Sequence, residues 1–140
     1  MKKRLESVIR TDEAADDLVL LLRGGVHARE VERLQSQAAD LDRLYTWRGG
    51  PCFGVSVFAA TPDTEGDVLA TRMDVRRSYY RINYSDIAGR LVVVPTFRAP
   101  HWTVMFDGPR GAQYQLLVDC YGQLRENPYW TRKPGRRPPR

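Results

Sequence analysis

Cysteine is scarce in this sequence, and the two that it contains, Cys52 and Cys120, lie far apart. They do not form a Cys-x-x-Cys pair, and no combination of Cys and His has the spacing of a zinc site. We therefore interpret both cysteines as free buried thiols, and we expect neither a structural metal nor a cofactor.

Long hydrophobic runs are also absent. The longest, LVLLL at residues 18–22, is far shorter than the roughly 18–20 apolar residues of a membrane-spanning helix. The basic start MKKR is not followed by the apolar segment that a secretory signal needs. These absences predict a cytoplasmic protein without a membrane partner.

Several motifs that bind nucleotides or carry out hydrolysis are missing as well. The sequence has no P-loop, no G-x-G-x-x-G and no G-x-S-x-G, so nucleotide-driven motors, Rossmann enzymes and serine hydrolases have no support. The carboxylates gather near the N-terminus and along expected helix surfaces. That distribution is typical of solvated side chains rather than of paired acid/base groups or metal ligands.

Positive charge is abundant, but it is unevenly placed. The net charge is +5, and arginine outnumbers lysine by 19 to 3. The segment 131–140, TRKPGRRPPR, carries five of the 22 basic residues and no acidic one, so residues 1–130 hold 17 residues of each sign. The basic isoelectric point therefore does not indicate a basic cleft in the domain.

The hydrophobic pattern predicts an α+β domain over residues 1–130, followed by a disordered tail at 131–140. We expect one mixed sheet of about five strands, with helices packed mainly on one face. The expected strands are 18–23, 52–60, 76–84, 91–94 and 101–106. The expected helices are one from His27 that ends before Gly49, one from Thr61 to Met73, and one over 113–125.

Apolar residues at helical or alternating spacing define the expected core. Each of the following lies on the apolar face of its element and is predicted to be buried: Leu34, Leu41, Val55, Val57, Val93, Val104 and Leu117.

The stretch PTFRAPHWTVMF, residues 95–106, carries the first candidate site. Period-two alternation places His101 on the face opposite Trp102, and therefore away from the main core. His101 as acid or base, Arg98 as the cation and Tyr80 as a stacking ring would form a metal-free ribonuclease site. The alternative is a plain scaffold hairpin, with His101 at an edge and Arg98 solvated.

The stretch RRSYYRINY, residues 76–84, interleaves arginines with tyrosines. This arrangement can stack bases and hold phosphates. It is also what an exposed strand of high β-propensity looks like, and we favour that interpretation.

The basic tail is a third candidate. Pro and Arg cannot bury apolar surface, so we expect the tail to be disordered and free to bind RNA or a cognate protein partner. The residues expected to make such contacts are Arg132, Lys133, Arg136 and Arg137. The alternative is a solvated chain end without a partner.

Two short stretches, LLRGG and GVSVFAA, resemble the general layout of ADP-ribosyltransferase domains. The resemblance implies that Arg23 and Ser56 help to place NAD. In that family a downstream glutamate activates the ribose, whereas this sequence has no glutamate between Asp67 and Arg125.

GVSVFAA and VVVPTFRAPHWTVMF also resemble stretches in small uncharacterised actinobacterial proteins. That resemblance implies a bacterial protein of the kind encoded in toxin–antitoxin or defence loci. From the residues and this resemblance together, we expect a toxin–antitoxin-type protein that acts on RNA. A non-enzymatic interaction module that binds through its tail is the first alternative, and an ADP-ribosyltransferase-like enzyme is the second.

Overall fold

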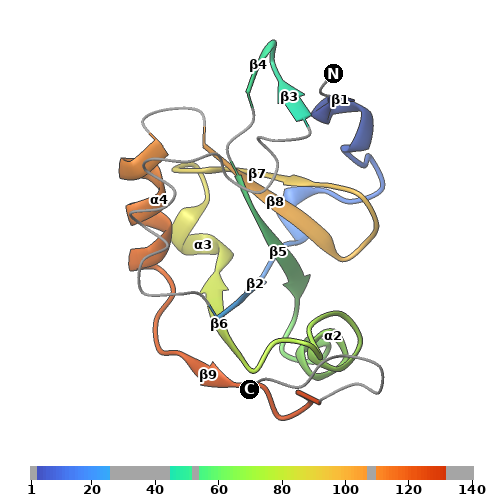
Figure 1. Ribbon diagram of the computed structural model, residues 1–140, viewed down its shortest axis with the longest axis vertical. Coiled ribbons are helices and arrows are strands. Elements are labelled where there is room, and N and C mark those ends of the chain that lie inside the picture. Colours follow the sequence, from blue (N-terminus) through green and yellow to red (C-terminus); the bar gives the residue numbers. More distant parts are fainter. Residues whose placement is uncertain (1–2, 26–44, 52–53, 107–109, 132–140) are drawn as a thin grey trace, which may run out of the picture.

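The computed structural model describes residues 3–25, 45–51, 54–106 and 110–131, and its centre is a six-stranded antiparallel sheet (Figure 1). The strand order is β7-β8-β5-β2-β6-β9. The α+β class is confirmed, with six antiparallel strands where about five in a mixed sheet were expected. The strands are β2 (Leu20–Gly24), β5 (Gly54–Ala60), β6 (Ser78–Asn83), β7 (Val92–Pro95), β8 (His101–Met105) and β9 (Arg125–Glu126).

A second, small sheet was not expected from the sequence. It consists of β1 (Lys3–Arg4), β3 (Tyr45–Trp47) and β4 (Gly50–Pro51), in the order β1-β3-β4. The turn between β3 and β4 uses positive φ angles at Arg48 and Gly49, of 52° and 79°, which is typical of a tight hairpin. Strands of two or three residues carry too little alternation to be recognised in a sequence.

Three α-helices lie in the described residues: α2 (Glu65–Arg72), α3 (Tyr84–Ile87) and α4 (Arg110–Asp119). The helix predicted over 113–125 ends six residues early, because the chain turns at Gly122 with a φ of 65° and continues into β9. Most of the helix predicted from His27, with Leu34 and Leu41, lies outside the described residues. The end of that segment forms β3 instead.

One face of the large sheet is closed by α3 and α4, which Figure 1 shows together on one side of the sheet. Its core contains Trp102, Tyr114 and Ile82, none of which is more than 1% exposed. The predicted burial of Val55, Val57, Val104 and Leu117 is confirmed, whereas Val93 is half-buried against this core. Burial of this much apolar surface is the main favourable contribution to folding.

The opposite face is covered in two separate parts. At one end, Val68 and Leu69 of α2 pack on Leu22 and Tyr79. At the other end, a short 3₁₀ helix, η1 (Leu5–Val8), packs its Leu5 on Met105, while a second one, η2 (Ala15–Asp17), precedes β2. The β6 strand, expected to be exposed, instead buries Tyr79 and Ile82 on its two faces because it lies between β2 and β9.

The glycines after β2 allow two segments to approach each other closely. A Cβ atom at Gly24 would lie 3.1 Å from Nε of Arg76, and one at Gly25 would overlap the hydroxyl of Ser78. A larger residue at Gly25 would therefore require Ser78 to shift, whereas one at Gly24 would displace only the flexible side chain of Arg76. No helix within the described residues is long and apolar enough to cross a membrane.

Candidate functional site

A pocket of about 240 Å³ opens on the face that is covered in two parts, between α2 and the β7–β8 hairpin. Its polar lining comes from four elements that are distant in the sequence. The lining residues are Arg23, Gly24, Ser56, Phe58, Arg72, Met73, Val75, Arg76 and His101. We call this space the His101 pocket.

The His101 ring is oriented by two threonines that are fully buried. The Oγ1 atom of Thr96 lies 2.8 Å from Nδ1 of His101 and 2.7 Å from Oγ1 of Thr103. The ring also makes edge contacts with Phe58 and Phe97, at centroid distances of 5.4 and 5.2 Å. A ring fixed through one nitrogen and two aromatic neighbours presents the rest of the imidazole in a defined direction.

The N-terminal segment holds the hairpin that carries His101. The guanidinium of Arg10 donates to the backbone oxygen of His101 at 2.8 Å, and Asp12 and Glu13 accept from the same guanidinium. The backbone N–H of Arg10 also donates to the oxygen of Pro95 at 2.8 Å. The position of His101 therefore depends on contacts from residues about 90 positions earlier in the chain.

Arg23 and Ser56, which carry the resemblance to ADP-ribosyltransferases, both border this pocket, but Arg23 pairs with Tyr80 between β2 and β6, so its side chain leaves the sheet on the face closed by α3 and α4. The Nη1 atom of Arg23 donates to the backbone oxygen of Ser56 at 3.2 Å. Arg23 is only 8% exposed, an unusual burial for a charged side chain.

Two further arginines come from α2 and the turn that follows it. Arg72 donates from Nη2 to the backbone oxygen of Ala99 at 2.9 Å, which links α2 to the hairpin loop. Arg76 packs its side chain over Gly24. Both residues are exposed at the surface, so their charges are accessible to a ligand.

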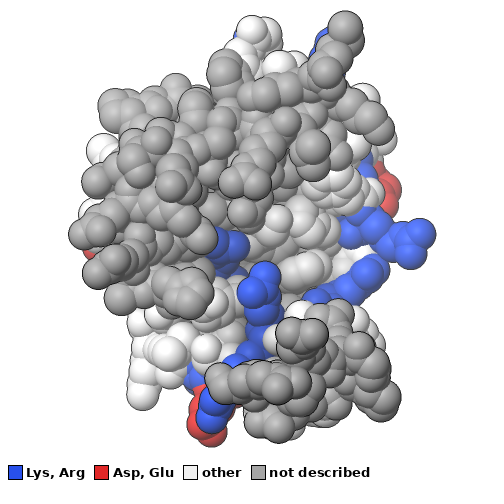
Figure 2. Space-filling view, viewed as in Figure 1, with Lys and Arg blue, Asp and Glu red and all other residues white. Residues whose placement is uncertain are grey.

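Among the described residues, the lining of the His101 pocket contains three arginines, of which Arg72 and Arg76 are exposed, and no carboxylate. Figure 2 shows Lys and Arg side chains gathered where Figure 1 places the end of β5 and the β7–β8 hairpin, with acidic side chains only at the margin of that view. Arginine presents several donors in a planar fork that matches phosphate and carboxylate groups. The chemistry of the pocket is therefore that of an anion site with an imidazole in its wall.

The structure brings together only part of the predicted catalytic group. His101 lies in the pocket and opposite Trp102, as the alternation predicts. Arg98 is exposed on the hairpin loop and does not line the pocket. Tyr80 lies on the other face of the sheet, where its ring stacks on Tyr121 at 4.5 Å.

Sequence reasoning missed Arg72, which stands at the end of a predicted helix and looks like an ordinary solvated charge in the sequence. Arg76 opens the stretch RRSYYRINY, for which phosphate binding was an alternative but an exposed strand was favoured. The pair of glycines after Arg23 indicates a close approach but not to which segment. The tail residues Arg132, Lys133, Arg136 and Arg137 lie outside the described residues, and their binding role stays a prediction.

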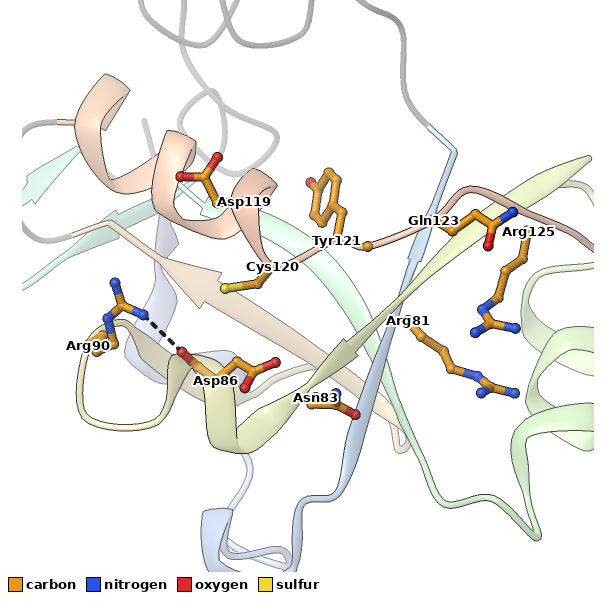
Figure 3. A pocket seen from close by; sticks show the side chains of 10 residues that line it. Arg81, Asn83, Asp86, Arg90, Asp119, Cys120, Tyr121, Gln123 and Arg125 are labelled. Atoms are coloured by element: carbon orange, nitrogen blue, oxygen red, sulfur yellow. Dashed lines mark hydrogen bonds between the residues drawn. The ribbon is translucent and has the colours of Figure 1, made fainter.

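A larger pocket of about 530 Å³ lies at the edge of β6, beyond the short β9 (Figure 3). Its lining mixes charges of both signs: Arg81, Arg90 and Arg125 with Asp86 and Asp119. Figure 3 shows Arg81 and Arg125 at one end and Asp119 and Arg90 toward the other. We call this space the mixed pocket.

The mixed pocket also contains the half-buried free thiol of Cys120, while Cys52 lies outside the described residues. Burial raises the pKa of the Cys120 thiol, and the negative charge of Asp86 raises it further against the opposing effect of Arg90. The thiol is therefore protonated near neutral pH and is a poor nucleophile.

Arg81 is held at the mixed pocket by Glu65, the first residue of α2. Its Nε and Nη2 atoms lie 2.8 and 2.7 Å from the two carboxylate oxygens, and the Tyr79 hydroxyl donates to the same carboxylate at 2.7 Å. Desolvation raises the pKa of Glu65, but the hydrogen bonds from Arg81 and Tyr79 outweigh it, so the pKa lies below its ordinary value. Burial and the Glu65 contact raise the pKa of Tyr79.

Among the described residues, no group of three or more His, Cys, Asp or Glu side chains is arranged to hold a metal ion. No protein-family model matches this chain, and neither a curated protein nor a solved structure shows significant similarity to it. The fold and the site define an α+β domain with a pocket that is lined by arginines and a histidine.

Proposed function

We propose that this protein binds RNA through a backbone phosphate in the His101 pocket and cleaves it without a metal ion, as a ribonuclease of the toxin–antitoxin type. The observation that supports this most is that His101 shares a pocket with the exposed arginines Arg72 and Arg76, and that no carboxylate of the described residues lines this pocket. An anionic phosphodiester is attracted by such a lining.

RNA is the polymer that suits this set of groups, because it carries its own nucleophile. The 2′-oxygen attacks phosphorus while His101 takes the proton of the 2′-hydroxyl. The bond from phosphorus to the 5′-oxygen then breaks, and the protonated imidazole of His101 returns this proton to the departing oxygen. The products are a 2′,3′-cyclic phosphate and a 5′-hydroxyl, so no water, metal or cofactor is consumed. The arginines stabilise the additional negative charge on the phosphate oxygens in the transition state.

Cleavage of a labelled single-stranded RNA in the presence of EDTA tests this function. The wild type is expected to yield 2′,3′-cyclic phosphate ends, and His101→Gln to lose about 100-fold or more of the rate, as general acid–base variants do. Arg125→Gln, which changes a cation of the mixed pocket, is the matched control and should cleave like the wild type. Equal cleavage by His101→Gln and the wild type, or no cleavage of any RNA, would contradict the proposal.

The contact between Arg23 and Ser56 favours one second candidate, an ADP-ribosyltransferase-like enzyme. The same pocket would then take the pyrophosphate of NAD. No described carboxylate lines the pocket to activate the ribose, which makes this the weaker candidate. Release of nicotinamide from NAD, lost in Ser56→Ala, would support it over the ribonuclease.

The interaction-module alternative depends on the tail, which begins at Thr131. The N–H of Thr131 donates to the oxygen of Asp74 at 3.1 Å, and residues 132–140 lie outside the described residues. Deletion of 132–140 should leave the melting temperature unchanged, because Pro and Arg bury little apolar surface. Loss of a co-purifying protein on this deletion, with RNA cleavage retained, would show that the tail binds a partner.

A further inference from the structure

The hairpin loop that carries Arg98 also holds an aromatic side chain in a strained conformation. Phe97 has a φ of 59°, in the left-handed region that bulky residues rarely adopt. It is also 41% exposed, so burial of its ring is far from complete. A strained and exposed aromatic residue beside a candidate active site is a reason to look for a ligand contact.

The surroundings hold Phe97 at the rim of the His101 pocket. Its N–H donates to the backbone oxygen of Val8 at 2.9 Å, which fixes the loop against the N-terminal segment. Its ring meets the His101 ring edge-on, with 5.2 Å between centroids and planes at 78°. Phe97 does not line the pocket itself, so its ring lies next to the imidazole and outside the space that a phosphate would occupy.

This placement has a consequence for the nucleotide that the pocket would hold. When a phosphate sits beside His101, the base of an adjoining nucleotide lies within a few ångströms of the pocket mouth. An aromatic ring at that position can stack on any unpaired base, since every base has a π-face. A base within a duplex is covered by its neighbours on both faces and cannot stack on a protein ring without leaving the helix.

We propose that Phe97 is a base-stacking residue and that the RNA taken by this site is single-stranded. The inference rests on the proposed function, and it adds the substrate class and one specificity-determining residue. Arg98, exposed directly after Phe97, then contacts the phosphate that follows the stacked base. This assigns a binding role to a residue that sequence reasoning placed in the catalytic group.

Binding to a 2′-O-methyl oligoribonucleotide tests the inference, because this RNA lacks the nucleophilic hydroxyl and is not cleaved. Fluorescence anisotropy is measured for the single strand and for the same strand in a duplex. We expect the wild type to bind the single strand more tightly, Phe97→Trp to retain this affinity, and Phe97→Gly to lose about tenfold. Glycine accepts the positive φ without strain, so we expect this variant to stay folded, and a thermal melt verifies this.

Tyr129→Ala is the matched control, since Tyr129 is an aromatic residue of similar exposure outside the pocket. Its single-strand affinity should equal that of the wild type. An RNA with an abasic nucleotide at the stacking position should remove the difference between the wild type and Phe97→Gly.

Two results would overturn the inference while the proposed function stands: unchanged single-strand binding by Phe97→Gly, or duplex binding as tight as single-strand binding. If neither the wild type nor any variant binds RNA, the proposed function fails first, and the inference fails with it.

Discussion

The two faces of the large sheet differ in how they are covered. On the face under α3 and α4, one continuous core runs from Val93 at the β7 edge to Ile82 near the β6 edge. On the opposite face, α2 and the N-terminal segment each cover one end, and their clusters share no residue. The His101 pocket lies beside α2 on this second face, where the strands present Ser56 and His101 in place of aliphatic side chains.

Because they are covered differently, the two faces contribute differently to stability and to ligand binding. A face that is closed by apolar packing provides free energy of folding and leaves space for a ligand only at its edge, where the mixed pocket lies. A face that is covered in two parts buries less apolar surface and leaves polar side chains accessible to a ligand. Changes to the two faces should therefore have different effects, and the following predictions proceed from the largest to the smallest.

Truncation of the closed core should have the largest effect on folding. Leu117 is fully buried between α4 and the sheet. Leu117→Ala should lower the free energy of unfolding by about 2–5 kcal/mol, because the cavity adds to the lost burial. Chemical denaturation measures the change. Leu124→Ala, at a residue that is 50% exposed, is the control and should have little effect.

Removal of the Glu65 charge should have an intermediate effect, because glutamine keeps only one acceptor oxygen for the donors of Arg81 and Tyr79 and places an N–H donor where the other oxygen was. Glu65→Gln should lower the free energy of unfolding by about 1–3 kcal/mol. The Arg81 side chain is 40% exposed, and water therefore compensates part of the loss. A variant as stable as the wild type would show that α2 is not anchored through this ion pair.

The same ion pair predicts a pH dependence. The pKa of Glu65 is lowered in the folded protein, so its stabilising contribution is present above the ordinary carboxyl pKa of 4.5 and is lost as the pH falls through the lower, native value. The difference in unfolding free energy between the wild type and Glu65→Gln should therefore shrink below about pH 4.5. A difference that stays constant down to pH 3 would contradict this assignment.

Replacement of an arginine in the His101 pocket should have the smallest effect on folding and a clear effect on binding. Arg76 is exposed and packs over Gly24, so Arg76→Gln should change the free energy of unfolding by no more than about 0.5 kcal/mol. Affinity for single-stranded RNA should fall by about tenfold, and less at high salt. Arg77→Gln, at the neighbouring exposed residue, is the charge-matched control.

The sequence correctly predicted the elements with strong hydrophobic periodicity. It failed where the end of an element, or a contact between distant segments, determines the structure. The β5 strand and the β7–β8 hairpin follow from alternation, and the same alternation placed His101 opposite Trp102. The end of α4 was missed because Tyr121 and Leu124 continue the helical spacing past the helix itself. Leu124 is exposed, so spacing alone did not show that the chain had already turned.

Only part of the candidate site could be predicted, because contacts between segments distant in the sequence bring the rest together. His101 was found because histidine is rare in this chain, whereas Arg72 is one arginine among nineteen and Arg76 was assigned to an exposed strand. Their role depends on where α2 packs, and that contact joins segments about 30 residues apart in sequence. Tyr80 was predicted to lie in the site as a stacking ring from the aromatic stretch RRSYYRINY. In β6, however, its side chain points to the closed face and stacks on Tyr121.

An NMR titration of the His101 imidazole tests the central claim most directly, namely that the smaller His101 pocket, and not the larger mixed pocket, is the anion site. The ring signals are assigned by comparison with His101→Gln, and a short 2′-O-methyl RNA is then added at low salt. We predict saturable shifts of the His101 signals that weaken in Arg76→Gln and are unchanged in Arg125→Gln. Unchanged His101 signals, or RNA binding that is lost in Arg125→Gln and retained in Arg76→Gln, would contradict the account.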